Sequence, residues 1–191
     1  RRQRQMCIRD SSVTGKPITP RSTNQLKLVK EFDKNDMIFA IGPAGSGKTY
    51  TAIALAVRAL KNKEIKKIIL SRPAVEAGEK LGFLPGDMKD KIDPYLQPLY
   101  DALQDMIPAA KLKEYMELNI IQIAPLAFMR GRTLNDAIVI LDEAQNTTTQ
   151  QIKKVLEKSI TMVMEKKPPC MTIIVQLPFT VITVSYTHLT L

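Results

Sequence analysis

The stretch Ala40–Tyr50, AIGPAGSGKTY, decides how the rest of this sequence is interpreted. It contains the pattern G-x-x-x-x-G-K-[ST], in which a glycine-rich turn surrounds nucleotide phosphates. Such a turn must bring backbone N–H groups close to phosphate oxygens, and glycines allow this because they have no Cβ. The residues that we predict to bind the nucleotide here are Gly42, Pro43, Ala44, Gly45, Ser46, Gly47, Lys48, Thr49 and Tyr50.

The segments on either side of this loop support the prediction. Met37–Ile41 is a short apolar run that predicts a buried strand, and Thr49–Leu60 is rich in alanine and leucine, which predicts a helix. The N-terminus of that helix would point at the phosphates. We expect Lys48 to contact the β- and γ-phosphates and Thr49 to ligate Mg²⁺, so ATP and Mg²⁺ are the expected ligands. A chance match in a glycine-containing turn is the alternative.

Further apolar runs predict a larger sheet. Strands are expected at Lys66–Ser71, Asn119–Pro125, Ala137–Gln145 and Cys170–Leu177, and helices at Gln25–Phe32, Ala109–Glu117 and Thr147–Ser159. Asp87–Met106 is helical in character, but we expect interruptions at Pro94 and Pro98. Apolar strands without alternation, separated by helices, predict an α/β fold with a parallel sheet and helices on both faces. Ligands of such sheets bind at the carboxyl ends of the strands.

A second motif follows the apolar run Ile138–Leu141. Asp142 is expected to hold Mg²⁺ through water, and Glu143 to polarise the attacking water as the catalytic base. Taken alone, an Asp-Glu pair after a strand is better explained as a helix N-cap than as a catalytic pair. Gln145 resembles the residue of superfamily 1 and 2 helicases that links nucleotide state to the nucleic-acid site. Glu143, Gln145 and Lys48 form the predicted catalytic set, and Thr49 and Asp142 the predicted metal ligands.

Composition bounds the possible partners. The 191 residues have a formal net charge of +9 and 45% hydrophobic residues, which suits one globular domain with a polyanionic partner or simply a basic surface. No run of 18 apolar residues is present, so no membrane partner is expected. Cysteine is scarce, and Cys170 is the only one outside the two terminal segments, which favours the cytoplasm.

The two ends of the chain share an unusual relationship. With one allowed set of codons, QRQMCIRD at residues 3–10 and VSYTHLTL at residues 184–191 are in-frame antisense copies of each other. We therefore expect residues 1–11 and 184–191 to be translated sequencing adapter, and residues 12–183 to be the domain. A genuine basic N-terminal tail is the alternative. The expected C-terminal adapter includes His188, the only histidine of the chain. Without the expected N-terminal adapter, the formal net charge falls from +9 to about +6.

The assembled motifs resemble the PhoH family. They read GPAGSGKTYTAIALAV, SRPAVEAGEKLGFLPGD, PYLQPLYDAL and APLAFMRGRTLNDAIVILDEAQNTT, within about Pro17 to Leu156. The resemblance implies a RecA-like P-loop NTPase core, here truncated, in a bacterial cytoplasmic ATPase related to superfamily 1 helicases. It also implies RNA as the partner and a homo-oligomeric ring. After about residue 156 the sequence departs from the family pattern, because an expected Gly-Asp at a strand end is missing.

The resemblance gives further residues candidate roles. Gln25 resembles a helicase Q motif whose amide contacts adenine, since an amide offers both a donor and an acceptor; an exposed helix-start glutamine is the alternative. Arg72 could contact phosphate, brace the loop or form a structural ion pair. Arg130 and Arg132 are candidate γ-phosphate sensors or act across a subunit boundary, whereas Phe83 is expected to pack a loop.

The sequence thus predicts an ATPase that binds ATP and Mg²⁺ and remodels RNA or a ribonucleoprotein, with RNA helicase activity as one form. A nucleotide-gated binding module without motor activity is the first alternative. A small-molecule kinase is the second, although kinases with this loop generally lack a strand followed by Asp-Glu-x-Gln.

Overall fold

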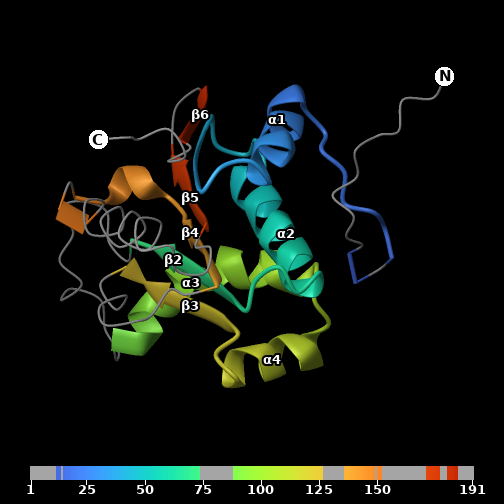
Figure 1. Ribbon diagram of the computed structural model, residues 1–191. Coiled ribbons are helices and arrows are strands. Elements are labelled where there is room, and N and C mark those ends of the chain that lie inside the picture. The colour runs from blue at the N-terminus through green and yellow to red at the C-terminus, as the bar shows by residue number, and fades with distance from the viewer. Residues whose placement is uncertain are drawn as a thin grey trace.

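The computed structural model describes residues 12–13, 15–73, 88–126, 136–148, 150–151, 171–176 and 180–184 (Figure 1). The described strands are β1 (Met37–Ile41), β2 (Lys67–Arg72), β3 (Ile121–Pro125), β4 (Ala137–Leu141), β5 (Met171–Gln176) and β6 (Thr180–Val184). The helices are α1 (Thr23–Phe32), α2 (Lys48–Lys61), α3 (Met88–Gln104), α4 (Ala109–Glu117) and the short 3₁₀ helix η3 (Ala144–Asn146).

Within these residues the strands form a six-stranded sheet in the order β3-β2-β4-β5-β1-β6. The first five strands in this order run parallel, and β6 pairs antiparallel with β1 at the edge. The expected α/β class with a parallel sheet is therefore confirmed, while β6 was not predicted. Strand β5 separates the two strands that carry the sequence motifs, and it pairs Ile173 with Ile38 on one side and with Ile140 on the other.

One face of the sheet carries most of the described core. Strand residues Ile38, Leu70 and Ile140 are fully buried there, in one cluster with apolar residues of α1, α2, α3 and α4. Burying a large aliphatic side chain contributes about 1.5–3 kcal/mol, so this layer holds the four helices against the sheet. Helix α2 lies in the middle of that layer and has an unbroken buried run from Thr51 to Val57.

The opposite face holds a smaller described cluster. Ile69, Val139 and Leu141 pack there with Leu126 and with Ala144 of η3. Successive residues of one strand alternate between the two faces, so an all-apolar β4 contributes to both clusters. The helix expected at residues 147–159 lies largely outside the described residues.

Helix α3 corrects one expectation. It continues past Pro94 and Pro98, where the sequence predicted interruptions. A proline inside a helix removes one hydrogen bond and crowds the preceding turn, which costs about 3 kcal/mol. Leu96, Leu99 and Leu103 recur on one side of the helix, and all three are buried in the core, so their packing offsets the local penalty. None of the described helices, α3 included, is long and apolar enough to cross a membrane.

Candidate active site at the carboxyl ends of the strands

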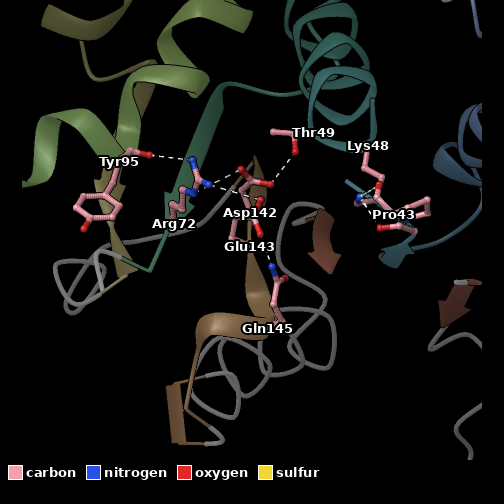
Figure 2. A network of polar contacts seen from close by, with 9 residues as sticks. Pro43, Lys48, Thr49, Arg72, Tyr95, Asp142, Glu143 and Gln145 are labelled. Carbon is pink, nitrogen blue, oxygen red and sulfur yellow. Dashed lines mark hydrogen bonds and ion pairs between the residues drawn. The ribbon is translucent and has the colours of Figure 1, made fainter. Parts of the chain in front are cut away.

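The predicted motifs meet at one edge of the sheet. Because β1, β2 and β4 are parallel, the residues that follow them emerge on the same side. The loop after β1 leads into α2, Arg72 ends β2, and Asp142 directly follows β4. Figure 2 shows Lys48, Thr49, Arg72, Asp142 and Glu143 around this edge.

The loop depends on glycine at two positions. Gly45 and Gly47 adopt left-handed backbone angles, with φ of +73° and +75°, which residues with a Cβ rarely adopt. Gly47 is also the N-cap of α2. A Cβ at Gly47 would lie 2.8 Å from Nε2 of Gln25, so helix α1 packs directly onto the loop. These features let the backbone turn sharply before the first N–H groups of α2.

The ammonium group of Lys48 lies over the loop. Its Nζ donates to the carbonyl oxygens of Gly42 at 2.6 Å and Pro43 at 2.8 Å, and it is 3.4 Å from Oγ of Ser46. Burial lowers the pKa of Lys48, and the negative charges of Glu143 and Asp142 act in the opposite direction. A phosphate group would therefore compete with two loop carbonyls for this cation.

Thr49 and Asp142 form the contact that joins the two motifs. The Thr49 hydroxyl donates to Oδ1 of Asp142 at 2.7 Å, although the residues are 93 positions apart in the chain. Asp142 is 3% exposed, and its backbone N–H donates to the carbonyl oxygen of Ser71 at 2.8 Å. Burial raises the pKa of Asp142, and the hydrogen bond from Thr49 and the charge of Arg72 partly oppose this rise. A hydroxyl and a carboxylate in contact are the oxygen ligands that Mg²⁺ prefers.

Glu143 is held from two sides. Oε1 is 3.5 Å from Nη2 of Arg72, and Oε2 accepts a hydrogen bond from Nε2 of Gln145. Its backbone has a φ of +51°, a left-handed conformation that is uncommon for a residue other than glycine. Strained backbone of this kind is often found at functional sites. Gln145 keeps its Oε1 buried and, among the described residues, without a hydrogen-bond partner.

Two cavities flank the loop. The larger, about 560 Å³, lies between the loop and α3, and its wall includes Thr49, Tyr50, Asp142, Glu143 and Gln145. Its other side is closed by Pro98, Asp101 and Ala102 of α3 and by Asp105, which follows the end of that helix. Burial raises the pKa of Tyr50 in this wall, and Asp105 raises it further. A triphosphate and its metal would fit between these two walls.

The second cavity, about 470 Å³, lies on the α1 side of the loop and is lined by Gln25, Ile41, Pro43, Ser46 and Lys48 among others. A purine base would be accommodated here, next to the predicted adenine-contacting glutamine. Lys48 lines both cavities.

The structure gives Gln25 a contact that the sequence did not predict. Nε2 of Gln25 donates to the carbonyl oxygen of Ser46 at 2.8 Å, and Oε1 accepts from the backbone N–H of Arg21 at 2.6 Å. The amide therefore joins the segment before α1 to the loop. Because an amide group has two N–H donors and two lone pairs, one of each remains for a base.

Several residues for which the sequence predicted a role lie outside the part of the chain that the structure describes. Phe83, Arg130 and Arg132 lie outside the described residues, as do residues 1–11 and 185–191. Val184, which was assigned to the C-terminal adapter segment, pairs with Met37 in β6. The sequence did not predict that α3, and Asp105 just after its end, form the other wall of the larger cavity.

The described residues fit ATP with Mg²⁺. The loop offers a glycine backbone whose turn leaves no room for a Cβ at Gly47, together with the first N–H groups of a long helix. Thr49 and Asp142 offer the oxygen pair for a metal, and Lys48 offers a cation for phosphate. In the sheet, β5 lies between β1, which precedes the loop, and β4, which precedes Asp142. This strand order fits a P-loop NTPase core of RecA-like type.

Comparisons with known proteins agree with this geometry. A family model described as PhoH-like protein matches residues 17–163. The PhoH-like protein of Bacillus subtilis (strain 168) is 62% identical over 144 residues, which cover 75% of this chain and 45% of that protein. Protein PhoH of Escherichia coli (strain K12) is 45% identical over 152 residues, or 78% of this chain and 43% of that protein.

The chain thus spans less than half the length of these relatives. Among solved structures, the Sulfolobus solfataricus SWI2/SNF2 ATPase core in complex with dsDNA aligns with a TM-score of 0.42 at 18% identity. That alignment covers 83% of this chain and 31% of the other. The family match extends over most of the chain and includes every motif of the site, so the chain belongs to the PhoH family.

Proposed function

We propose that this protein binds ATP with Mg²⁺ and hydrolyses it, and that the hydrolysis drives work on RNA or a ribonucleoprotein in the cytoplasm. The observation that carries the proposal is the 2.7 Å contact between the Thr49 hydroxyl and the Asp142 carboxylate. It brings the phosphate loop and the acidic strand end to one point, which a phosphoryl-transfer site requires.

The chain's own groups divide the work. Backbone N–H groups of the loop and Lys48 would bind the phosphates, while Thr49 and Asp142 would hold Mg²⁺. When bound, Mg²⁺ neutralises charge on the phosphate oxygens. Glu143 would accept a proton from the attacking water while the water oxygen forms a bond to the γ-phosphorus. The bond from that phosphorus to the bridging oxygen breaks, and ADP and inorganic phosphate leave.

Phosphate release is the direct test. We expect the protein to release inorganic phosphate from MgATP, and single-stranded RNA to stimulate the rate. Glu143→Gln should retain nucleotide binding but lose roughly 10²-fold or more in rate, since general-base catalysis typically contributes 10²–10⁴-fold. Glu117→Gln, at the exposed end of α4, is the matched control. Equal rates in the parent and in Glu143→Gln would remove this residue from the reaction.

One observation favours a second function, a nucleotide-gated binding module without turnover. Both carboxylate oxygens of Glu143 already have protein partners, Arg72 and Gln145. If these partners held the carboxylate pointing away from the γ-phosphate, the attacking water would not be activated and ATP would bind without turnover. RNA affinity that changes with ATP, but with no phosphate release, would support this alternative. Ring assembly is a further part of the family-based proposal, and sedimentation with and without ATP would test it.

A further inference from the structure

Arg72 lies where three parts of the site meet. It is the last residue of β2, and β2 pairs directly with β4, so its side chain extends toward the carboxylates that follow β4. In Figure 2 the guanidinium lies between Tyr95 on one side and Asp142 and Glu143 on the other. Its side chain is 22% exposed, so the contacts are largely shielded from water.

The guanidinium faces one oxygen of each carboxylate. Nε is 4.0 Å from Oδ2 of Asp142, and Nη2 is 3.5 Å from Oε1 of Glu143. The other two oxygens are occupied by Thr49 and Gln145. Every oxygen of the two carboxylates therefore has a partner, and Arg72 is the one residue among them that contacts both. Its planar fork can reach several groups at once, which a lysine ammonium cannot do in the same geometry.

The third contact leads away from the reaction centre. Nη1 donates to the backbone carbonyl oxygen of Tyr95 at 3.0 Å, and Tyr95 lies inside α3. The next two turns of this helix carry Pro98, Asp101 and Ala102, which line the larger cavity. The same cation thus joins the two carboxylates on one wall of the cavity to the helix that forms the other wall.

We propose that Arg72 is a positioning residue, which fixes the orientation of Asp142 and Glu143 and couples it to the position of α3. The inference rests on the proposed ATP hydrolysis and deepens it. A shift of α3 would pull on the guanidinium through Tyr95 and change the direction in which the Glu143 carboxylate points. Whatever contacts the exposed side of α3 would then be able to adjust the hydrolysis rate without touching the nucleotide.

Two other roles make different predictions. A direct phosphate contact by Arg72 would mainly weaken nucleotide binding when removed. A purely structural ion pair would lower stability and leave the rate of the remaining folded protein unchanged. A positioning role instead lowers the maximal rate with little change in affinity, because misplacing a catalytic group by about 1 Å can cost roughly 10²-fold.

The test compares Arg72→Ala and Arg72→Lys with the control Lys66→Ala, which removes an ion pair to Asp136 at the other ends of the strands. Phosphate release from MgATP and titration with a fluorescent ATP analogue separate kcat from affinity. We expect both Arg72 variants to lose roughly 10–100-fold in kcat, with affinity within about threefold of the parent. Added guanidinium ion at millimolar concentration should partly restore Arg72→Ala and leave the Arg72→Lys and Lys66→Ala rates unchanged. An unchanged kcat, a loss of affinity equal to the loss in kcat/KM, or no rescue would overturn the proposal.

Hydrogen exchange provides a readout that does not depend on turnover. Without nucleotide, amides of α3 around Tyr95 should exchange faster in Arg72→Ala than in the parent, and Lys66→Ala should match the parent. Unchanged α3 exchange in Arg72→Ala would refute the link to the helix. If the parent itself released no phosphate, the proposed hydrolysis would fail, and altered α3 exchange would still establish the coupling.

Discussion

Substituting Gly47 with alanine tests how α1 supports the phosphate loop. Two separate costs are expected. The left-handed backbone, with φ of +75°, penalises any Cβ by about 1–2 kcal/mol. The new Cβ would also lie 2.8 Å from Nε2 of Gln25 and would displace that group from the Ser46 carbonyl. Losing this hydrogen bond costs a further ~0.5–1.5 kcal/mol.

Gly45 offers a matched control. Its φ of +73° is nearly the same, but a Cβ there meets no described atom within 4 Å. Both substitutions share the backbone penalty and the gain of about 0.4–1 kcal/mol from restricting the unfolded chain. The difference between them therefore isolates the contact with Gln25, and we expect Gly47→Ala to be less stable than Gly45→Ala by about 0.5–1.5 kcal/mol.

Urea unfolding of the variants in a double-mutant cycle measures this difference in stability. In a Gln25→Ala background the contact is gone, so the gap between Gly47→Ala and Gly45→Ala should shrink to about 0.3 kcal/mol or less. The slope of unfolding free energy against urea should stay constant, since the exposed surface does not change. A gap that persists without Gln25, or a Gly45→Ala variant as unstable as Gly47→Ala, would refute the packing argument.

Three further outcomes are expected from the described contacts. Lys48→Ala should weaken ATP binding by about 1.5–3 kcal/mol, or roughly tenfold to 150-fold, because a charge-assisted phosphate contact is lost; calorimetric titration with unchanged affinity would contradict this. Asp142→Asn should stabilise the metal-free protein at pH 7, since burial raises the pKa of Asp142 in the fold. The penalty for the charged form sets in as the pH rises above the unfolded-state pKa, so the gain should vanish in acid; urea unfolding of both proteins across this pH range would measure it, and a gain independent of pH would contradict it. Ser22→Ala should destabilise the protein by about 1 kcal/mol, because Oγ of Ser22 caps α1 by accepting from the N–H of Gln25 at 3.2 Å, and thermal unfolding of this variant would measure it.

The sequence predicted the parts of the fold that are encoded locally. Met37–Ile41 matched β1, and Ala109–Glu117 matched α4, because apolar runs and helix-forming residues act over a few positions. The fourth strand was predicted to reach Gln145, but β4 ends at Leu141, directly before Asp142, and residues 144–146 form the 3₁₀ helix η3. The strand order and β6 could not be predicted this way, since pairing partners are distant in the chain.

The site was predictable to the same extent. The loop and the acidic motif have fixed spacings, so the residues near the phosphates could be named without knowing the fold. Two hydrogen bonds could not be predicted: the one from Arg72 to the Tyr95 carbonyl and the one from Gln25 to the Ser46 carbonyl. Both acceptors are backbone oxygens, which every residue type has, so the sequence does not identify them. The helix around Pro94 and Pro98 was predicted, but its interruption at these prolines was wrong, because burial of its leucines outweighed the local cost of proline.

The central place of β5 has a consequence for how the protein is made. On the ribosome, the strand bearing the phosphate loop and the strand bearing Asp142 emerge long before residues 171–176, yet the sheet holds them apart by the width of that late strand. A nascent chain that has not yet delivered β5 lacks the spacer between them. We therefore expect nucleotide to bind only after translation has passed this point, so that ATP cannot stabilise an unfinished polypeptide.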